Sequence, residues 1–355
     1  MFSSLRIEGY RGLKEFTMKD LGRVNLLVGS NNSGKTSVLE AISLLASAGD
    51  SNFLRRTLWS RGEGFPTSGD TLELDVAHLF TGHEIRPGST LRISATNGKL
   101  SRDLQFLIGE GSPTGLVAIG GPSHLQMELK GTPKPQVDTM GLTSSGGLLM
   151  YARNVPNKRK HQDMNEALPA LFITTESFTG EELVGMWNQV VLTPDEDLVL
   201  KALQFLDPDI ERIAAYGTTH SSSTRNGFIV KRKGSTQPIP IGSMGDGMWR
   251  MLALAIAITQ CRGGVLLVDE IDTGLHYTAM SRMWKLVYQA AVNMDVQVFA
   301  TTHSADCFQS LAEVSAEVAS PGAITIQRIE SGRPRAVHYN SNELAAIASS
   351  DIEVR

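Results

Sequence analysis

Apolar and polar residues alternate along the chain in a way that predicts an α/β protein interrupted by a β-rich region. The opening residues 2–10 alternate as a strand does. Residues 24–28 are nearly all apolar, which is typical of a strand buried on both faces of a sheet. The apolar pattern of residues 37–48 then predicts a helix, closed by Gly49 and Asp50.

The pattern of apolar and polar residues changes in the middle of the chain. Short alternating stretches at 71–76, 90–94 and 125–129 are separated by turn residues, so we expect an antiparallel β subdomain there. Residues 131–165 are rich in glycine, proline and polar groups, and we interpret them mainly as loop.

The C-terminal half returns to an α/β pattern. Helical periodicity is found at 181–191 and 195–206. Beyond residue 210, we expect strands at 210–216, 228–231, 265–268, 296–300 and 323–329, and helices at 248–260, 277–292 and 305–312.

A glycine-bearing loop follows the first buried strand and has the form G-x-x-x-x-G-K-T over residues 29–36. Its glycines allow backbone N–H groups to surround phosphates, and the helix that follows adds a favourable dipole. Lys35 is expected to reach the β- and γ-phosphates of ATP, and Thr36 to offer its hydroxyl to Mg²⁺. The residues expected to line the nucleotide are Gly29, Asn31, Asn32, Ser33, Gly34, Lys35, Thr36 and Ser37.

Two further strands end in residues suited to hydrolysis. The strand at 265–268 runs into Asp269 and Glu270, for which we expect Mg²⁺ binding and general-base catalysis, respectively. The strand at 296–300 leads to His303, which could sense the γ-phosphate. Solvated acids and a structural histidine are the alternatives, and the phosphate-binding loop favours the catalytic interpretation.

A second candidate phosphate-binding segment, residues 243–247, precedes the apolar helix at 248–260. Ser243 and Gly245 would present a hydroxyl and backbone N–H groups at the positive end of that helix. One nucleotide does not need two such surfaces from one chain, whereas two subunits facing head-to-tail would use both. An N-capped core helix is the alternative.

Composition limits the other functions. The net charge is −4, so total charge does not predict strong attraction to nucleic acid, although a local run is present at 158–160. The two cysteines, Cys261 and Cys307, form no CxxC pair. The N-terminus lacks a secretory h-region and the apolar run 251–258 is too short to span a bilayer, so we expect a soluble cytoplasmic protein without membrane contact.

Taken in order, these motifs resemble the SMC/RecF-like branch of ABC ATPases, and in particular the OLD-like stand-alone ATPase heads. The resemblance implies an α/β P-loop NTPase of ABC/SMC-head type, with a mixed central sheet, an antiparallel β subdomain and a helical subdomain. A single head would span residues 1–355. Its parts would be a Walker A lobe at 1–69, a β-rich insertion at 70–165, a helical subdomain at 166–208 and a lobe with the signature, Walker B and switch histidine at 209–355.

The resemblance assigns roles to particular residues. Ser243 and Gly245 would contact the nucleotide of a partner subunit, and residues 271–276 would form the D-loop. Residues 243–247 occupy the position of the family's signature motif, and Met244 stands where that motif usually has its first glycine. His276 stands where the D-loop of ABC transporters has aspartate. Arg11 as a phosphate contact and His78 as the Q-loop residue are further candidates.

The resemblance also suggests two functions. In the first, a homodimer or higher even oligomer binds and hydrolyses ATP with Mg²⁺ and regulates a separate effector, a nuclease or toxin, in anti-phage defence. No TOPRIM-like nuclease pattern follows the ATPase motifs, so the effector would be another polypeptide. In the second, the protein is a RecF-like DNA-binding repair ATPase, for which residues 158–160 are the motivating feature.

Overall fold

A computed structural model provides the structure of the chain. It describes residues 1–67, 71–98, 101–111, 123–132, 135–151, 167–176, 178–216, 227–318, 320, 322–340, 343–344 and 346. A six-stranded sheet lies at its centre, and its strands, in spatial order, are β11 (Ala170–Ile173), β15 (Val265–Val268), β16 (Gln297–Thr301), β3 (Val24–Val28), β17 (Ile324–Arg328) and β18 (Val337–Tyr339). All neighbouring pairs are parallel except β17 with β18, which makes the sheet mixed as expected.

The central sheet is covered on both faces, which explains why its strands are nearly continuous apolar runs. Successive residues of β3 point to opposite faces: Leu26 packs into one hydrophobic core and Leu27 into the other. In β15, Leu266 and Leu267 divide in the same way. The sheet therefore lies between the two cores, and its strands are packed on both faces.

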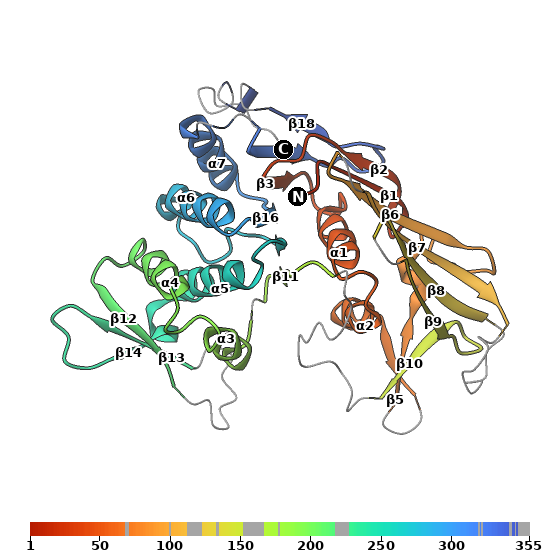
Figure 1. The fold of residues 1–355 in the computed structure, drawn as a ribbon, viewed down its shortest axis with the longest axis horizontal. Coiled ribbons are helices and arrows are strands. Elements are labelled where there is room, and N and C mark those ends of the chain that lie inside the picture. The colour runs from red at the N-terminus through yellow and green to blue at the C-terminus, as the bar shows by residue number, and fades with distance from the viewer. Residues whose placement is uncertain are drawn as a thin grey trace.

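Helices from different parts of the chain cover the two faces of the central sheet (Figure 1). One face carries α1 (Lys35–Ala46), which begins at the phosphate-loop motif and lies between the central sheet and a second, antiparallel sheet. The other face carries α5 (Asp246–Gln260), α6 (Tyr277–Asn293) and α7 (Ala305–Glu317). The phosphate loop and the 243–247 segment consequently lead into helices on opposite sides of one sheet.

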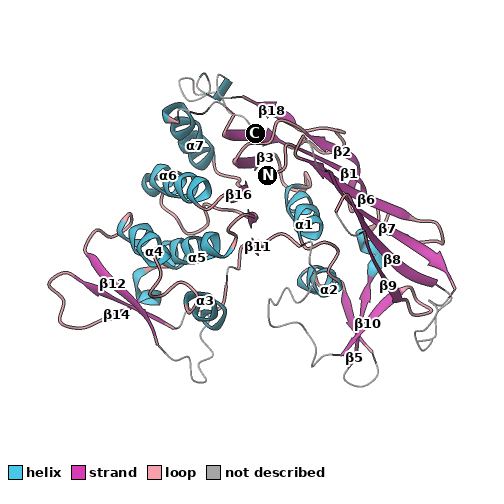
Figure 2. Ribbon diagram, viewed as in Figure 1, coloured by secondary structure: helices cyan, strands magenta, loops and turns pink. Residues whose placement is uncertain are grey.

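The antiparallel sheet has six strands and packs on α1 (Figure 2). Its strands, in spatial order, are β2 (Leu13–Met18), β1 (Ser4–Tyr10), β6 (Thr90–Thr96), β7 (Ser101–Glu110), β8 (Ser123–Lys130) and β9 (Gln136–Gly141). Because β1 and β2 belong to it, the sheet crosses the boundary expected at residue 69. Helix α2 (Ser51–Ser60) and a small sheet of β10 (Gly147–Tyr151), β5 (Thr71–Asp75) and β4 (Gly64–Pro66) lie beside it.

The helical subdomain packs on α5, on the far side of the central sheet from α1. It contains α3 (Gly180–Trp187) and α4 (Asp195–Gln204). A three-stranded sheet of β12 (Ile210–Ala215), β13 (Phe228–Arg232) and β14 (Ile239–Pro240) adjoins it. Phe228 packs edge-to-face against Trp187 and against Trp249. These ring contacts join the subdomain to α5.

The predicted secondary structure is confirmed for the most strongly patterned strands. Other elements were not predicted, among them β2, α2, β7 and β11. Strand β3 and strand β15 have the predicted bounds. Residues 131–165, interpreted mainly as loop, contain β9 and β10. Strand β9 is an edge strand that pairs only with β8 in the described part of the chain. Only its Met140 is buried, so the strand lacks a strong apolar signal. Residues 158–160 lie outside the described residues.

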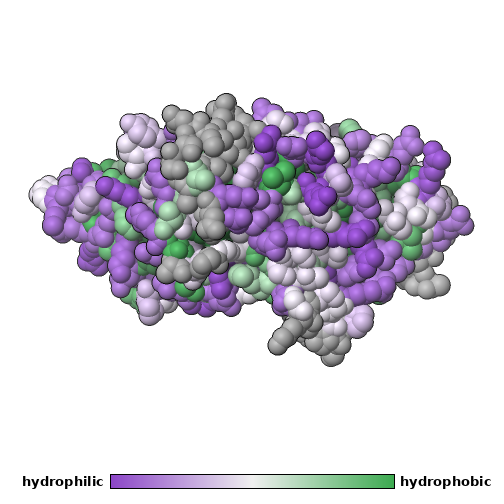
Figure 3. Space-filling model, turned by 90° about the horizontal axis from the view of Figure 1, so that it is seen from above, coloured by the Kyte–Doolittle hydropathy of each residue, from purple (hydrophilic) through white to green (hydrophobic). Residues whose placement is uncertain are grey.

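No described helix combines the length and apolarity needed to cross a bilayer. The face shown in Figure 3 is mainly hydrophilic, and apolar residues appear there only in separate patches.

Candidate active site

The loop between β3 and α1 has the backbone of a phosphate cradle. Gly29 and Gly34 have φ values of 142° and 100°, which side chains other than glycine rarely adopt. A Cβ on Gly29 would lie 2.2 Å from the carbonyl oxygen of Ile329, so the close approach of the chain also requires glycine. Asn32 also has a positive φ, of 60°. The loop is therefore held in a conformation that only this distribution of glycines permits.

Lys35 lies inside this loop, with 5% of its surface exposed. Its Nζ donates to the carbonyl oxygens of Gly29 at 2.9 Å and Ser30 at 2.8 Å. Burial lowers the pKa of Lys35, and the nearby carboxylates of Asp269 and Glu270 partly oppose this effect. The ammonium group is thus kept at the mouth of the loop, where it can meet an anion.

The loop also contains a buried polar atom without a partner. Ser33 is 5% exposed, and its Oγ makes no hydrogen bond. A buried hydroxyl without a partner is costly, and a ligand in the cradle could satisfy it. The positive φ values, the inward Lys35 and this unsatisfied hydroxyl together fit a bound polyphosphate.

Thr36 and Asp269 meet across the interface between α1 and the central sheet. The Thr36 Oγ1 lies 3.1 Å from Oδ2 and 3.4 Å from Oδ1 of Asp269. A hydroxyl and a carboxylate beside a phosphate cradle are the oxygen ligands that Mg²⁺ prefers. The structure therefore brings together the two residues predicted to hold the metal.

Glu270, the predicted general base, follows Asp269 in a constrained turn. Its φ is 46°, in the left-handed region that is uncommon for a non-glycine residue. The Thr301 hydroxyl accepts the Glu270 N–H at 2.8 Å and donates to the Asp269 carboxylate. One hydroxyl from β16 therefore fixes both acids at the end of β15, a role that the sequence analysis missed.

His303 follows the same strand. It is exposed and lies at the carboxyl end of β16, next to the end of β15 in the parallel sheet. The Thr302 hydroxyl donates to Asp272 at 2.6 Å and accepts the Ser304 N–H at 3.0 Å. Ser304 in turn caps α7. The turn that carries His303 is thus tied to Asp272, in the segment that follows Asp269 and Glu270.

The 243–247 segment forms a separate surface. Ser243 is exposed in a short 3₁₀ turn (Ile241–Met244), and Gly245, with a φ of 96°, is the N-cap of α5. A hollow of about 840 Å³ opens beside it, and no residue of the loop 29–36 lines this hollow. Its lining residues include Ser243, Gly245, Asp246, Gly274, His276 and Arg282.

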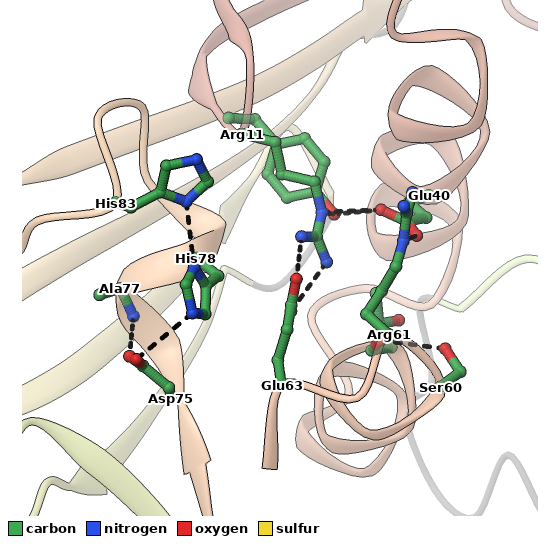
Figure 4. Close-up of polar contacts among 11 residues, drawn as sticks. Arg11, Glu40, Ser60, Arg61, Glu63, Asp75, Ala77, His78 and His83 are labelled. Carbon is green, nitrogen blue, oxygen red and sulfur yellow. Dashed lines mark hydrogen bonds and ion pairs between the residues drawn. The ribbon is translucent and has the colours of Figure 1, made fainter. Parts of the chain in front are cut away.

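Arg11 and His78 are engaged elsewhere (Figure 4). The Arg11 guanidinium forms ion pairs with Glu40 of α1, at 2.8 Å, and with Glu63. Glu40 is buried and also binds Arg61, so Arg11 neutralises a core carboxylate. His78 contacts Asp75 at 3.5 Å and His83 at 3.1 Å in a separate group. These contacts give Arg11 a structural role and supply no support for a phosphate contact.

Arg250 is the other residue that the sequence analysis missed, because it stands inside an apolar helical run. It is 3% exposed and donates to the carbonyl oxygens of Thr174 at 2.8 Å, Asp269 at 2.7 Å and Glu270 at 3.1 Å. Burial lowers its pKa to about 10, against the opposing effect of nearby acids. A lone arginine among buried apolar positions was the available signal.

Comparisons with known proteins find similarity to ATPase families and to an ATP/GTP phosphatase. Residues 1–103 match the AAA_15 family, described as an AAA ATPase domain. Residues 197–306 match the AAA_21 family, described as "AAA domain, putative AbiEii toxin, Type IV TA system". A Helicobacter pylori protein named ATP/GTP phosphatase is 22% identical over 345 residues, which cover 89% of each chain.

Two solved structures are similar over nearly their whole length. The SMC head domain from Thermotoga maritima is 10% identical, with a TM-score of 0.45, and the match covers 96% of this chain and 98% of that one. An SMC head with an extended coiled coil, bound to the C-terminal domain of ScpA and derived from Pyrococcus furiosus, is 11% identical, with a TM-score of 0.49 and 98% coverage of both chains. The two family matches lie in the N-terminal and C-terminal parts of the chain, and each covers less than half of it.

Proposed function

We propose that the chain binds ATP with Mg²⁺ at the loop 29–36 and hydrolyses it. The observation that carries this proposal is the meeting of Thr36 and Asp269 beside the buried ammonium of Lys35. Thr36 and Asp269 would hold the ion, which when bound neutralises charge on the phosphates. Backbone N–H groups of the loop, with the side chains of Asn31, Asn32, Ser33 and Ser37, would orient the triphosphate.

Glu270 and His303 complete the proposed reaction centre. Glu270 would accept a proton from the attacking water, because its backbone is fixed by Thr301 while its carboxylate remains only half-buried. His303, exposed at the end of the neighbouring strand, would hydrogen-bond the γ-phosphate. Lys35 would exchange its bonds to the loop carbonyls for bonds to the β- and γ-phosphates.

We further propose that two chains assemble head-to-tail, so that Ser243 and Gly245 of each close the nucleotide site of the other. Two observations support this arrangement. The signature segment is exposed and leads into a helix on the opposite face of the central sheet from α1. The hollow beside it is lined by none of the residues of the loop 29–36. A nucleotide on one chain would therefore reach the signature of a second chain.

The proposed biological role is control of a separate effector, a nuclease or toxin, in anti-phage defence. The name of the family matched by residues 197–306 refers to a toxin of a toxin–antitoxin system and supports this direction. In the part of the chain that the structure describes, no group of three or more His, Cys, Asp and Glu side chains is placed to hold a metal ion. Co-purification with the products of neighbouring genes tests the role, and a head that repeatedly purifies without any of them would contradict it.

The RecF-like alternative depended on residues 158–160, which lie outside the described residues. No observation in the described part of the chain favours it over effector control.

The core of the proposal is tested by measuring phosphate release and assembly state together. Wild-type protein should hydrolyse ATP in the presence of Mg²⁺, and Glu270→Gln should bind ATP and accumulate as a dimer in light scattering. A wild-type protein that binds ATP without hydrolysing it would overturn the enzymatic part. A Glu270→Gln variant that stays monomeric with saturating ATP would overturn the assembly.

A further inference from the structure

Helix α5, which follows the segment 243–247, contacts the turn formed by residues 269–274 at two points. A Cβ on Gly247 would lie 2.7 Å from the carbonyl oxygen of Gly274, so the two backbones touch directly. One turn of helix further on, Arg250 donates to the carbonyl oxygens of Asp269 and Glu270. The start of α5 and the 269–274 turn therefore form one packed unit.

The environment of Arg250 shows what its guanidinium is used for. It is 3% exposed on a helix whose neighbouring positions, Trp249 and Met251, are buried apolar residues. The carboxylates of Asp269, Asp272 and Glu270 are near enough to raise its pKa, but its hydrogen bonds go to main-chain atoms and its Nε is buried without a hydrogen-bond partner. A buried charge is costly unless it is well satisfied. The guanidinium is directed instead at three main-chain carbonyls, all at the carboxyl ends of β11 and β15.

These bonds complete the fixation of Glu270. Its N–H is held by the Thr301 hydroxyl from β16, and its carbonyl by Arg250 from α5. The peptide units on both sides of a left-handed residue are thereby anchored to different elements. Because such a conformation is favourable only when its surroundings impose it, the direction of the Glu270 side chain depends on these two anchors.

We propose that Arg250 is a positioning residue that couples the signature segment 243–247 to the general base of the same chain. The inference rests on the proposed function of Glu270. A partner's nucleotide that moves the start of α5 would, through Arg250, move the Glu270 turn and set it for hydrolysis in its own site. The two sites of a dimer would in this way communicate through α5 of each chain.

The test compares Arg250→Met with Arg250→Lys and with a matched control. Arg262→Met removes an arginine just beyond the far end of α5, where it pairs with Asp195 at the surface. We expect Arg250→Met to lower kcat on the order of 100-fold, because misplacing a catalytic group by a small distance has effects of that size. ATP affinity should stay within about twofold of wild type, since no contact to the nucleotide is removed. Arg250→Lys should recover part of the loss, and Arg262→Met should behave as wild type.

Two further readouts separate positioning from a loss of packing. Added to Glu270→Gln, Arg250→Met should cause little additional loss of kcat, because the residue acts through Glu270. Amide hydrogen exchange at 269–275 should quicken in Arg250→Met while residues 252–260 of α5 keep their protection. Unchanged exchange in that turn, or a full additional loss of activity in the double variant, would overturn the inference. If Glu270→Gln alone hydrolyses ATP normally, the proposed function is wrong, and the exchange measurement still decides whether Arg250 holds the turn.

Discussion

The hydroxyl of Thr36 lies 3.1 Å from the carboxylate of Asp269, although 233 residues separate them in sequence. Thr36 belongs to the first turn of α1, and Asp269 follows the last residue of β15. The parallel register that sets β15 and β3 on either side of β16 brings the ends of these strands together. The proposed metal site therefore depends on the central sheet and on two segments far apart in the sequence.

Removal of the Thr36 hydroxyl should weaken Mg²⁺ binding without removing ATP. Thr36→Ala is expected to raise the Mg²⁺ concentration that gives half-maximal hydrolysis about tenfold, and Thr36→Ser, which retains the hydroxyl, should stay near wild type. Titration of phosphate release with Mg²⁺ at saturating ATP measures this. An unchanged Mg²⁺ requirement in Thr36→Ala would show that the hydroxyl does not reach the metal.

Loss of the Lys35 ammonium should abolish tight nucleotide binding. Its hydrogen bonds to phosphate are of the charge-assisted kind, worth about 2–3 kcal/mol, so Lys35→Ala should weaken ATP affinity on the order of 100-fold. Lys201→Ala, on the exposed side of α4, is the matched control. Equilibrium binding of a fluorescent ATP analogue tests both variants. Equal affinities of the two variants would exclude Lys35 as a phosphate ligand.

Substitution of the proposed general base should separate binding from chemistry. Glu270→Gln is expected to lower kcat by about 10²- to 10⁴-fold while ATP affinity is kept, because the amide cannot accept the proton of the attacking water. Single-turnover kinetics with pre-bound ATP measures the chemical step directly. Hydrolysis at the wild-type rate would assign the base to another group.

The buried ion pairs of Arg11 predict a stability effect unrelated to the nucleotide. Glu40→Ala leaves Arg11 largely buried with one partner fewer, so the free energy of unfolding should fall by about 3 kcal/mol. Glu8→Ala, which removes an ion-pair partner of the exposed Arg6, should change it far less. Urea denaturation followed by circular dichroism measures both. Equal effects of the two variants would contradict the assignment of Arg11 to the core.

The residues of the proposed reaction centre could be proposed from the sequence because they lie in short segments at strand ends. Gly29, Lys35 and Thr36 occur in one contiguous motif, and Asp269 ends an apolar strand. The residues that position these groups were not predicted. Thr301 looks like the last residue of an ordinary strand, and Arg250 acts through main-chain carbonyls that carry no sequence signal. Such contacts depend on how α5, β15 and β16 pack, which is fixed only in three dimensions.

The same reasoning explains the errors in the fold. Strand β11 joins the edge of the central sheet with only Ala170–Ile173, too few residues to show a period. Strand β9 lies at an open edge and is half polar. Strand β1 was recognised as a strand, but only its pairing with β6 shows that it belongs to the antiparallel sheet.

The central claim is that each complete site takes its phosphate loop from one chain and its signature from another. Ser243→Arg should block closure while leaving ATP binding to the loop of its own chain intact. Lys35→Ala should lack nucleotide in its own loop but keep an intact signature. Each variant alone is therefore expected to be inactive.

An equimolar mixture of Ser243→Arg and Lys35→Ala tests the claim most directly. Half of the dimers formed at random contain one of each chain, and each of these has one intact site, so phosphate release should rise above that of either variant alone. It should not exceed about a quarter of the wild-type rate, because the intact site lacks the partner's nucleotide that would act through Arg250. Recovery of activity on mixing two inactive proteins is the predicted result. No recovery, with dimers of the mixed type shown by mass spectrometry, would contradict a site shared between two chains.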